Sequence, residues 1–268
     1  MKKTLCVIAT VIVLVMPISG MAELPYQTGF EAAEGFVLNQ SINGVDGWQT
    51  IGDAAATITD AQAQGGAQSV SLEPNSQIDK PLSAAPAESI IWMEGYFRGE
   101  GTTAEASFPP SSELPASAIV FFKKTGIQCY NGDTSSWEDT GVTPDPDNWI
   151  KISVRQDYTS KKWRCYINNA PAPDKELGFR DAEVTTLNGF RNFADTQSWF
   201  DTFRVIAVIK GDANSDSKVD AADIVALVND LDGSELDLIQ QDNADIDNNG
   251  SIDAADLTSL INKILGRS

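Results

Sequence analysis

Histidine is missing from all 268 residues of the chain. Its absence excludes Ser-His-Asp and Cys-His catalytic systems, together with the zinc sites that use imidazole ligands. Basic residues are also scarce, because 19 Lys and Arg stand against 38 Asp and Glu and leave a formal charge of −19. A chain this acidic repels nucleic acid and anionic lipid, and it is suited to calcium.

Long apolar runs are missing as well, except at the beginning of the sequence. Lys2 and Lys3 precede the apolar run 5–15, and small residues up to Ala22 follow at the spacing of a signal-peptidase site. The run is shorter than the roughly 20 residues that a membrane-spanning helix needs. We therefore predict a signal peptide over 1–22 and a secreted, extracellular mature protein outside the membrane. Its removal takes two lysines and no acid, so the charge moves from −19 to −21.

Cysteine is rare, and only Cys129 and Cys165 follow the predicted leader. In an exported protein such a pair suggests a disulfide. The alternative is two small buried hydrophobic side chains, a role in which cysteine is common. In either case we expect the two residues to be neighbours in space, because both lie on apolar strand faces.

Helical periodicity is missing from 23–209. The segment 149–155 alternates apolar and polar residues, and 163–167 does so again after a polar turn, which predicts a β-hairpin. Further strands are expected at 69–72, 89–97, 118–122 and 200–208. Many short strands over this length predict an antiparallel β-sandwich.

Aromatic residues are missing from 210–268, where 13 acids stand against 4 bases. Two apolar stripes with helical spacing occur here instead. They consist of Ile224, Leu227, Val228 and Leu231, and of Leu257, Leu260, Ile261 and Ile264. We therefore expect a small helical domain over 210–268, directly behind the sandwich of 23–209.

This region also contains a repeat, in which 212–223 is matched 33 residues later by 245–256. Oxygen-bearing side chains recur at positions 1, 3, 5, 9 and 12, and position 7 offers a backbone carbonyl, which is the spacing of a calcium-binding loop. The predicted ligands are Asp212, Asn214, Asp216, Lys218, Asp220 and Asp223, and Asp245, Asp247, Asn249, Ser251, Asp253 and Asp256. The alternative is a pair of solvated acidic turns in which Asp220 and Asp253 cap helices.

The two loops differ at position 6, where the sharp bend requires a positive φ. Gly250 adopts that conformation without cost, whereas Ser217 does so only with strain. We therefore expect the first loop to bind calcium more weakly than the second.

The duplicated loops, each followed by a helix and ending in aspartate, resemble type I dockerin modules over 211–266. The resemblance implies two loop–helix units about a pseudo-twofold axis, and a cohesin-like partner gripped by one helix face. At the positions that family members usually use for partner recognition, this chain has Ala221, Ala222, Ala254 and Ala255. The resemblance therefore supports the calcium ligands and leaves partner specificity open, including attachment or stabilisation of another kind.

The segments 28–31, 47–48, 66–70 and 199–203 look like parts of a concanavalin A-like or carbohydrate-binding jelly-roll over about 25–209. In such modules an acid near the first strand and an aspartate in the last strand often share a structural calcium. The resemblance assigns these roles to Glu31 and Asp201, which implies a third calcium site. The alternative is that both acids face solvent at strand ends.

Three functions remain for the sandwich. The first is a glycan-binding or structural sandwich. A glycan-binding domain would use exposed aromatic residues, for which Trp137 is the first candidate and Tyr130 and Tyr158 are the next. A divergent glycoside hydrolase or lyase would need paired carboxylates, but no Glu-x-Asp-x-x-Glu strand occurs, Glu94 stands alone and 138–139 lies among turns. The third function is surface adhesion or scaffolding without a sugar ligand.

Overall fold

The computed structural model describes residues 22–83, 89–105 and 115–267. The chain divides into two compact units, Met1–Val205 and Ile206–Ser268. The signal peptide predicted over 1–22 falls almost entirely outside the described residues. Within the described ranges, every helix is too short or too polar to cross a membrane.

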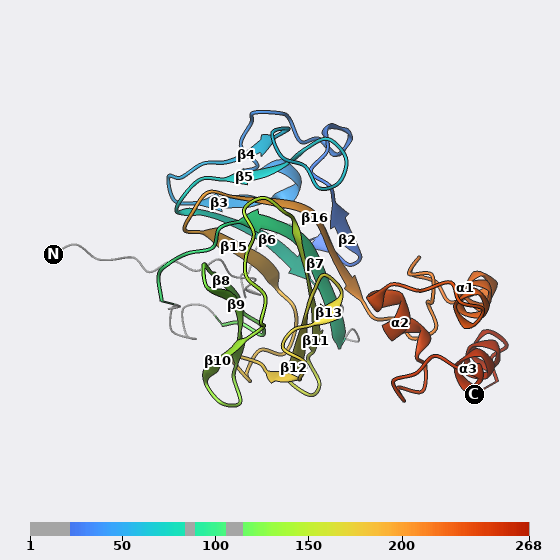
Figure 1. Ribbon diagram of the computed structural model, residues 1–268. Helices are drawn as coiled ribbons and strands as arrows, with labels where there is room; N and C mark the ends of the chain where they lie inside the picture. Colours follow the sequence, from blue (N-terminus) through green and yellow to red (C-terminus); the bar gives the residue numbers. More distant parts are fainter. Residues whose placement is uncertain (1–21, 84–88, 106–114, 268) are drawn as a thin grey trace. The chain divides into compact units, whose positions relative to one another are not determined.

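The first unit consists of β-sheets (Figure 1). Its largest sheet has the order β13-β12-β11-β7-β16-β5-β4, with β14 added to β12 and β2 to β16. A second sheet joins β6 to β15, β3 and the parallel edge strand β1, and a third has the order β10-β9-β8. The strands are β1 (Ala22–Glu23), β2 (Tyr26–Thr28), β3 (Gln49–Ile51), β4 (Ala56–Thr59), β5 (Ser69–Leu72), β6 (Ser76–Ser83), β7 (Ile90–Gly99), β8 (Val120–Lys123), β9 (Gly126–Asn131), β10 (Ser136–Asp139), β11 (Ile150–Asp157), β12 (Lys162–Ile167), β13 (Ala170–Pro171), β14 (Leu177–Gly178), β15 (Gly189–Ala194) and β16 (Ser198–Ala207).

The two larger sheets pack face to face through aromatic side chains. Phe190 on β15 lies 4.6 Å from Phe203 and 5.3 Å from Phe200, both on β16, measured between ring centroids. Trp48 and Phe30 complete this buried cluster. Full burial of one such ring contributes about 1.5–3 kcal/mol, so the cluster is the main element that joins the sheets.

The predicted hairpin is present as β11 and β12, with Val154 paired to Cys165. The all-β sandwich and the helical region behind it are therefore confirmed. Ile152 and Val154 on β11 are buried, as the period of two requires, and Ser153 between them is buried as well.

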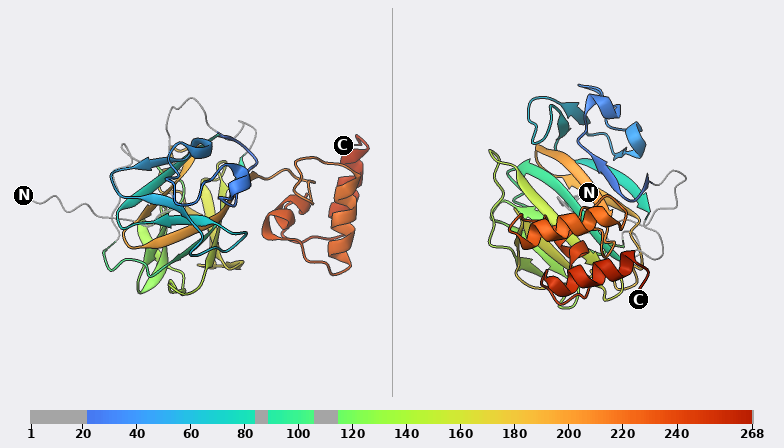
Figure 2. Two further views of the ribbon diagram at one scale, coloured as in Figure 1. Left: turned by 90° about the horizontal axis from the view of Figure 1, so that it is seen from above. Right: turned by 90° about the vertical axis from the view of Figure 1, so that its right-hand side faces the viewer.

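The second unit contains three helices, α1 (Ala221–Leu231), α2 (Leu238–Ala244) and α3 (Ala254–Ile264). α1 and α3 lie side by side (Figure 2), and Leu227 and Leu260, which occupy equivalent repeat positions, are fully buried between them with Ala213 and Ala244. α2 was not expected from the sequence. Only part of the apolar stripe of α1 is buried, because Val228 and Leu231 are each 44% exposed.

The two cysteines lie on different sheets of the sandwich. Cys129 on β9 and Cys165 on β12 are buried thiols in the structure. Burial raises the pKa of the Cys129 thiol, and contact with Cys165 raises it further. The two side chains are therefore neighbours, as the sequence analysis expected.

We propose that the cysteines form an inter-sheet disulfide in the exported protein, because an oxidising compartment converts adjacent thiols to a disulfide. The bond should stabilise the native state by roughly 2–4 kcal/mol. Denatured protein from an oxidising medium should resist alkylation until a reductant is added. The double variant Cys129→Ala with Cys165→Ala should have a lower melting temperature than the unchanged protein. Full alkylation without reductant would contradict the bond.

Candidate functional site

The two predicted calcium loops have the same hydrogen-bond framework at their first ligand position. Asp212 accepts the backbone N–H of Asp216 at 3.0 Å and that of Ser217 at 2.9 Å. Asp245 accepts the equivalent N–H groups of Asn249 at 3.0 Å and Gly250 at 3.1 Å. Each carboxylate thus holds its loop in a closed turn through two backbone hydrogen bonds.

The last ligand position of each loop belongs to a helix. Asp220 and Asp253 cap α1 and α3, and each donates its backbone N–H to the carboxylate three residues later, at 2.8 Å to Asp223 and 3.0 Å to Asp256. Asp223 and Asp256 are fully buried. The alternative interpretation of helix capping is therefore correct for Asp220 and Asp253, but it does not exclude calcium, because the same helix starts position the last ligand.

Three carboxylates converge in the second loop. Ligand oxygens of Asp245, Asp247 and Asp256 all lie within 4.8 Å of one another. Carboxylates this close repel, so a cation or a proton must resolve the conflict. In the first loop, burial is the main cause that raises the pKa of Asp212, and neighbouring Asp223 and Asp216 raise it further. A donor set made only of oxygens in tightly coiled loops fits calcium.

Backbone conformation confirms the predicted difference at position 6. Ser217 has φ +71° and Gly250 has φ +85°. At position 6, therefore, only the first loop places a side chain in the left-handed region, which costs energy. Position 4 is left-handed as well, at Ser215 and Asn248 with φ +58° each. The repeat of serine and asparagine at this position was a signal that the sequence analysis missed.

Asn243 on α2 is a structural residue that the sequence analysis also missed. Its buried side chain accepts the N–H of Ile209 at 2.9 Å and donates to the hydroxyl of Ser215 at 3.2 Å. Its carbonyl accepts the N–H of Gly211 at 2.7 Å. α2 therefore fixes the start of the first loop from outside the repeat.

The four alanines at the predicted partner-recognition positions, Ala221, Ala222, Ala254 and Ala255, are all exposed in the structure. Val228 on α1 and Ile261 on α3 continue this exposed surface at equivalent repeat positions, with Ile261 37% exposed. Each helix thus presents a small apolar face.

The three aromatic candidates of the sandwich have different environments. Trp137 on β10 is half-buried and meets Tyr130 on β9 edge to face, at 5.3 Å between centroids. Tyr158 is only 5% exposed, and its hydroxyl donates to Gln156 at 3.2 Å while its ring packs on Phe179. The prediction that Tyr158 stacks on a sugar was therefore wrong, because its side chain is buried and its hydroxyl forms a hydrogen bond inside the core.

Glu31 and Asp201 are brought to the same loop. The Glu31 carboxylate accepts the N–H of Ala67 at 2.8 Å and of Gln68 at 3.1 Å. Fully buried Asp201 accepts those of Gln64 at 2.8 Å and Gly65 at 3.1 Å. Burial raises the pKa of Asp201, and the charge of Glu31 contributes in the same direction.

Two of the acids considered for catalysis, Glu94 and Glu138, form ion pairs with basic side chains. The buried Glu94 carboxylate contacts Lys151 at 2.9 Å, Arg204 and the Ser153 hydroxyl. Glu138 binds Lys175 at 2.7 Å, and this bond lowers the pKa of the carboxyl. A general acid of a glycosidase needs a raised pKa, so the environment of Glu138 does not suit that role.

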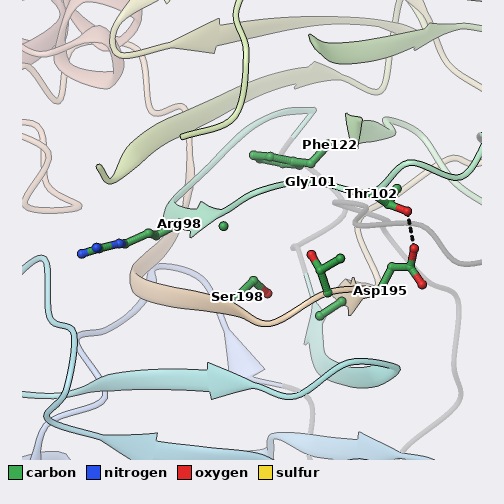
Figure 3. A pocket seen from close by; sticks show the side chains of 9 residues that line it. Arg98, Gly101, Thr102, Phe122, Asp195 and Ser198 are labelled. Carbon is green, nitrogen blue, oxygen red and sulfur yellow. Dashed lines mark hydrogen bonds between the residues drawn. The ribbon is translucent and has the colours of Figure 1, made fainter. Parts of the chain in front are cut away.

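A small cavity lies beside Asp195, whose carboxylate accepts the Thr102 hydroxyl (Figure 3). Phe122, Arg98 and Ser198 also line it. Its volume of about 30 Å³ holds one or two water molecules. It is therefore too small for a sugar ring.

Comparison with known proteins identifies the C-terminal region. Residues 210–265 match the dockerin type I domain. No curated protein matches the chain. We use the name dockerin module for these residues.

The chain is similar in structure to a sialidase, with 11% identity and a TM-score of 0.49 over 81% of this chain and 21% of the sialidase. The chain thus spans about a fifth of that protein's length. A xylan-binding CBM22 domain from Paenibacillus barcinonensis has 13% identity and a TM-score of 0.34, over 71% of this chain and 98% of the domain. Carbohydrate-binding module CBM66 from Bacillus subtilis has 12% identity and a TM-score of 0.39, over 64% of this chain and 99% of that module. Likeness at this level does not identify a ligand.

Calcium is expected to raise the helicity and melting temperature of the dockerin module. A ligand at 100 times its Kd stabilises the native state by about 2.7 kcal/mol. Asp245→Ala with Asp256→Ala should remove more of this response than Asp212→Ala with Asp223→Ala. Ser217→Gly should strengthen the first loop, because it removes the strain at positive φ. Circular dichroism in calcium and in chelator measures these effects, and identical melting in both would contradict calcium binding.

Proposed function

We propose that the chain is a secreted, calcium-dependent component of extracellular polysaccharide breakdown. Its dockerin module attaches the β-sandwich to a cohesin-type partner, and the sandwich binds glycan or serves structurally. The observation that carries this proposal is the matched pair of loops, whose identical frameworks begin α1 and α3. Two calcium ions would be held by the twelve residues of the sequence prediction, from Asp212 to Asp256.

The partner surface consists of the exposed faces of α1 and α3. Alanines at 221, 222, 254 and 255 leave room for close backbone approach, and Val228 and Ile261 supply apolar area beside them. Such a surface favours a cohesin-type partner with an apolar recognition patch over one that reads hydroxyl groups.

Retention on a panel of immobilised cohesin domains tests the attachment. Val228→Arg with Ile261→Arg should abolish calcium-dependent retention, because arginine places an unpaired charge in an apolar interface. Val37→Arg is the matched control, since Val37 is an exposed apolar residue of the sandwich. Retention that is equal with and without calcium, or that is unchanged in the double variant, would contradict the proposal that this surface binds the partner.

Trp137 and Tyr130 support the glycan-binding role, because a half-buried aromatic pair on strands offers ring surface to a sugar. A panel of polysaccharides, scored for retention and for release of reducing ends, separates the alternatives. Retention lost in Trp137→Ala but kept in Tyr158→Phe would support glycan binding. Release of reducing or unsaturated ends would instead indicate a hydrolase or lyase, and neither signal would favour adhesion or scaffolding.

We also propose a third calcium ion between Glu31 and Asp201. Both carboxylates hold the loop 64–68, and buried Gln68 has a side-chain oxygen without a hydrogen-bond partner in the described part of the chain. A buried oxygen without a partner, on a residue whose backbone N–H binds Glu31, is a further ligand of the kind that calcium accepts.

The test uses the full chain with both dockerin loops disabled by Asp212→Ala and Asp245→Ala. Calcium should still raise the melting temperature of the sandwich, and Glu31→Gln with Asp201→Asn should remove that response. A sandwich that melts identically with and without calcium would end the proposal of a third site.

A further inference from the structure

Four asparagines of the chain are followed by glycine, at 43–44, 131–132, 188–189 and 249–250. Asparagine is among the chemically labile residues. Its side-chain carbonyl carbon is attacked most readily when the next residue is glycine, because no side chain hinders the attacking backbone nitrogen. Of these four, Asn249 is the one at a predicted calcium-ligand position.

The structure holds both reacting groups of this pair. The Asn249 side chain accepts the N–H of Ser251 at 2.8 Å and donates to Asp247 at 3.0 Å. The Gly250 N–H, which carries the attacking nitrogen, donates to Asp245 at 3.1 Å. Both residues are exposed to water, so the closed loop, not burial, restrains the reaction.

We propose that Asn249 is a deamidation site controlled by calcium. The Gly250 nitrogen attacks Asn249 Cγ and forms a C–N bond, the Cγ–Nδ2 bond breaks, and ammonia leaves with the proton lost by Gly250. Water then opens the resulting succinimide to aspartate or isoaspartate. Cyclisation requires the carboxamide to rotate away from Ser251 and Asp247, which the closed loop prevents.

Calcium controls the reaction because it decides whether the loop stays closed, so this inference rests on the proposed calcium binding. Without a cation, Asp245, Asp247 and Asp256 repel one another and favour local opening. The open loop frees the Asn249 side chain and the Gly250 backbone together. With the ion bound, Asn249 is held as a ligand.

The two products differ in consequence. Aspartate at 249 restores the chemistry of the first loop, which has Asp216 at this position. Isoaspartate adds a methylene to the main chain and displaces the carbonyl of Ser251, the predicted ligand at position 7. A period without calcium would thus leave a lasting change in the stronger loop.

The test follows the full-length protein in excess calcium and in chelator at mildly alkaline pH. Digestion and mass spectrometry measure conversion of the peptide that contains 245–256. At calcium 100 times the Kd, the calcium-free population and the deamidation rate should both fall about a hundredfold. The exposed pair Asn43–Gly44 is the internal reference and should react at the same rate in both solutions.

Gly250→Ser, which copies the first loop, should slow the reaction in chelator because the serine side chain hinders the attack. A rate at Asn249 that is equal in both solutions, or faster with calcium, would overturn this proposal if calcium still raises the melting temperature. Equal rates together with unchanged melting would instead overturn the proposed calcium binding.

Discussion

Carboxylates gathered within a few ångströms repel each other, and the C-terminal module depends on how this conflict is resolved. Backbone N–H groups orient Asp245 and Asp256 but bring no net charge. A divalent cation would offset most of the negative charge of the acids and would bind their remaining lone pairs at the same time. Folding of the loop and binding of the ion are therefore expected to be one process.

The helices are linked to this process through their first turns. Asp223 and Asp256 stand at the third helical position, where a carboxylate interacts favourably with the helix dipole and with the capping residue. The same two acids are predicted ligands. Ion binding would thus also fix where α1 and α3 begin. In that way it would position the exposed face that contains Val228 and Ile261, which is the proposed partner surface.

Much of this was predictable from spacing alone. The helix starts and the buried pair Leu227 and Leu260 follow from a repeat and from a period of 3.6. The repeat also pointed to Asp245, Asp247 and Asp256, whose carboxylates converge. α2 was missed because its seven residues carry no apolar stripe. Periodicity also identified Val228 as apolar but not as exposed, since the pattern does not say which face is covered. Tyr158 was misplaced because its buried hydroxyl partners, Gln156 and Ser117, are 2 and 41 residues away in sequence.

The residue at position 6 of each loop affects two properties, namely how easily the bend forms and how well the preceding residue is protected from chemical attack. Glycine adopts the positive φ without strain, which favours ion binding, but it also leaves the neighbouring asparagine open to attack by the unhindered nitrogen. Serine is strained at the same angle, yet it shields that nitrogen, and Asp216 before it has no amide to lose. Affinity and chemical durability therefore favour different residues. The repeat contains both residues, with Gly250 in the loop that is predicted to bind more strongly and Ser217 in the loop that is predicted to be chemically more durable.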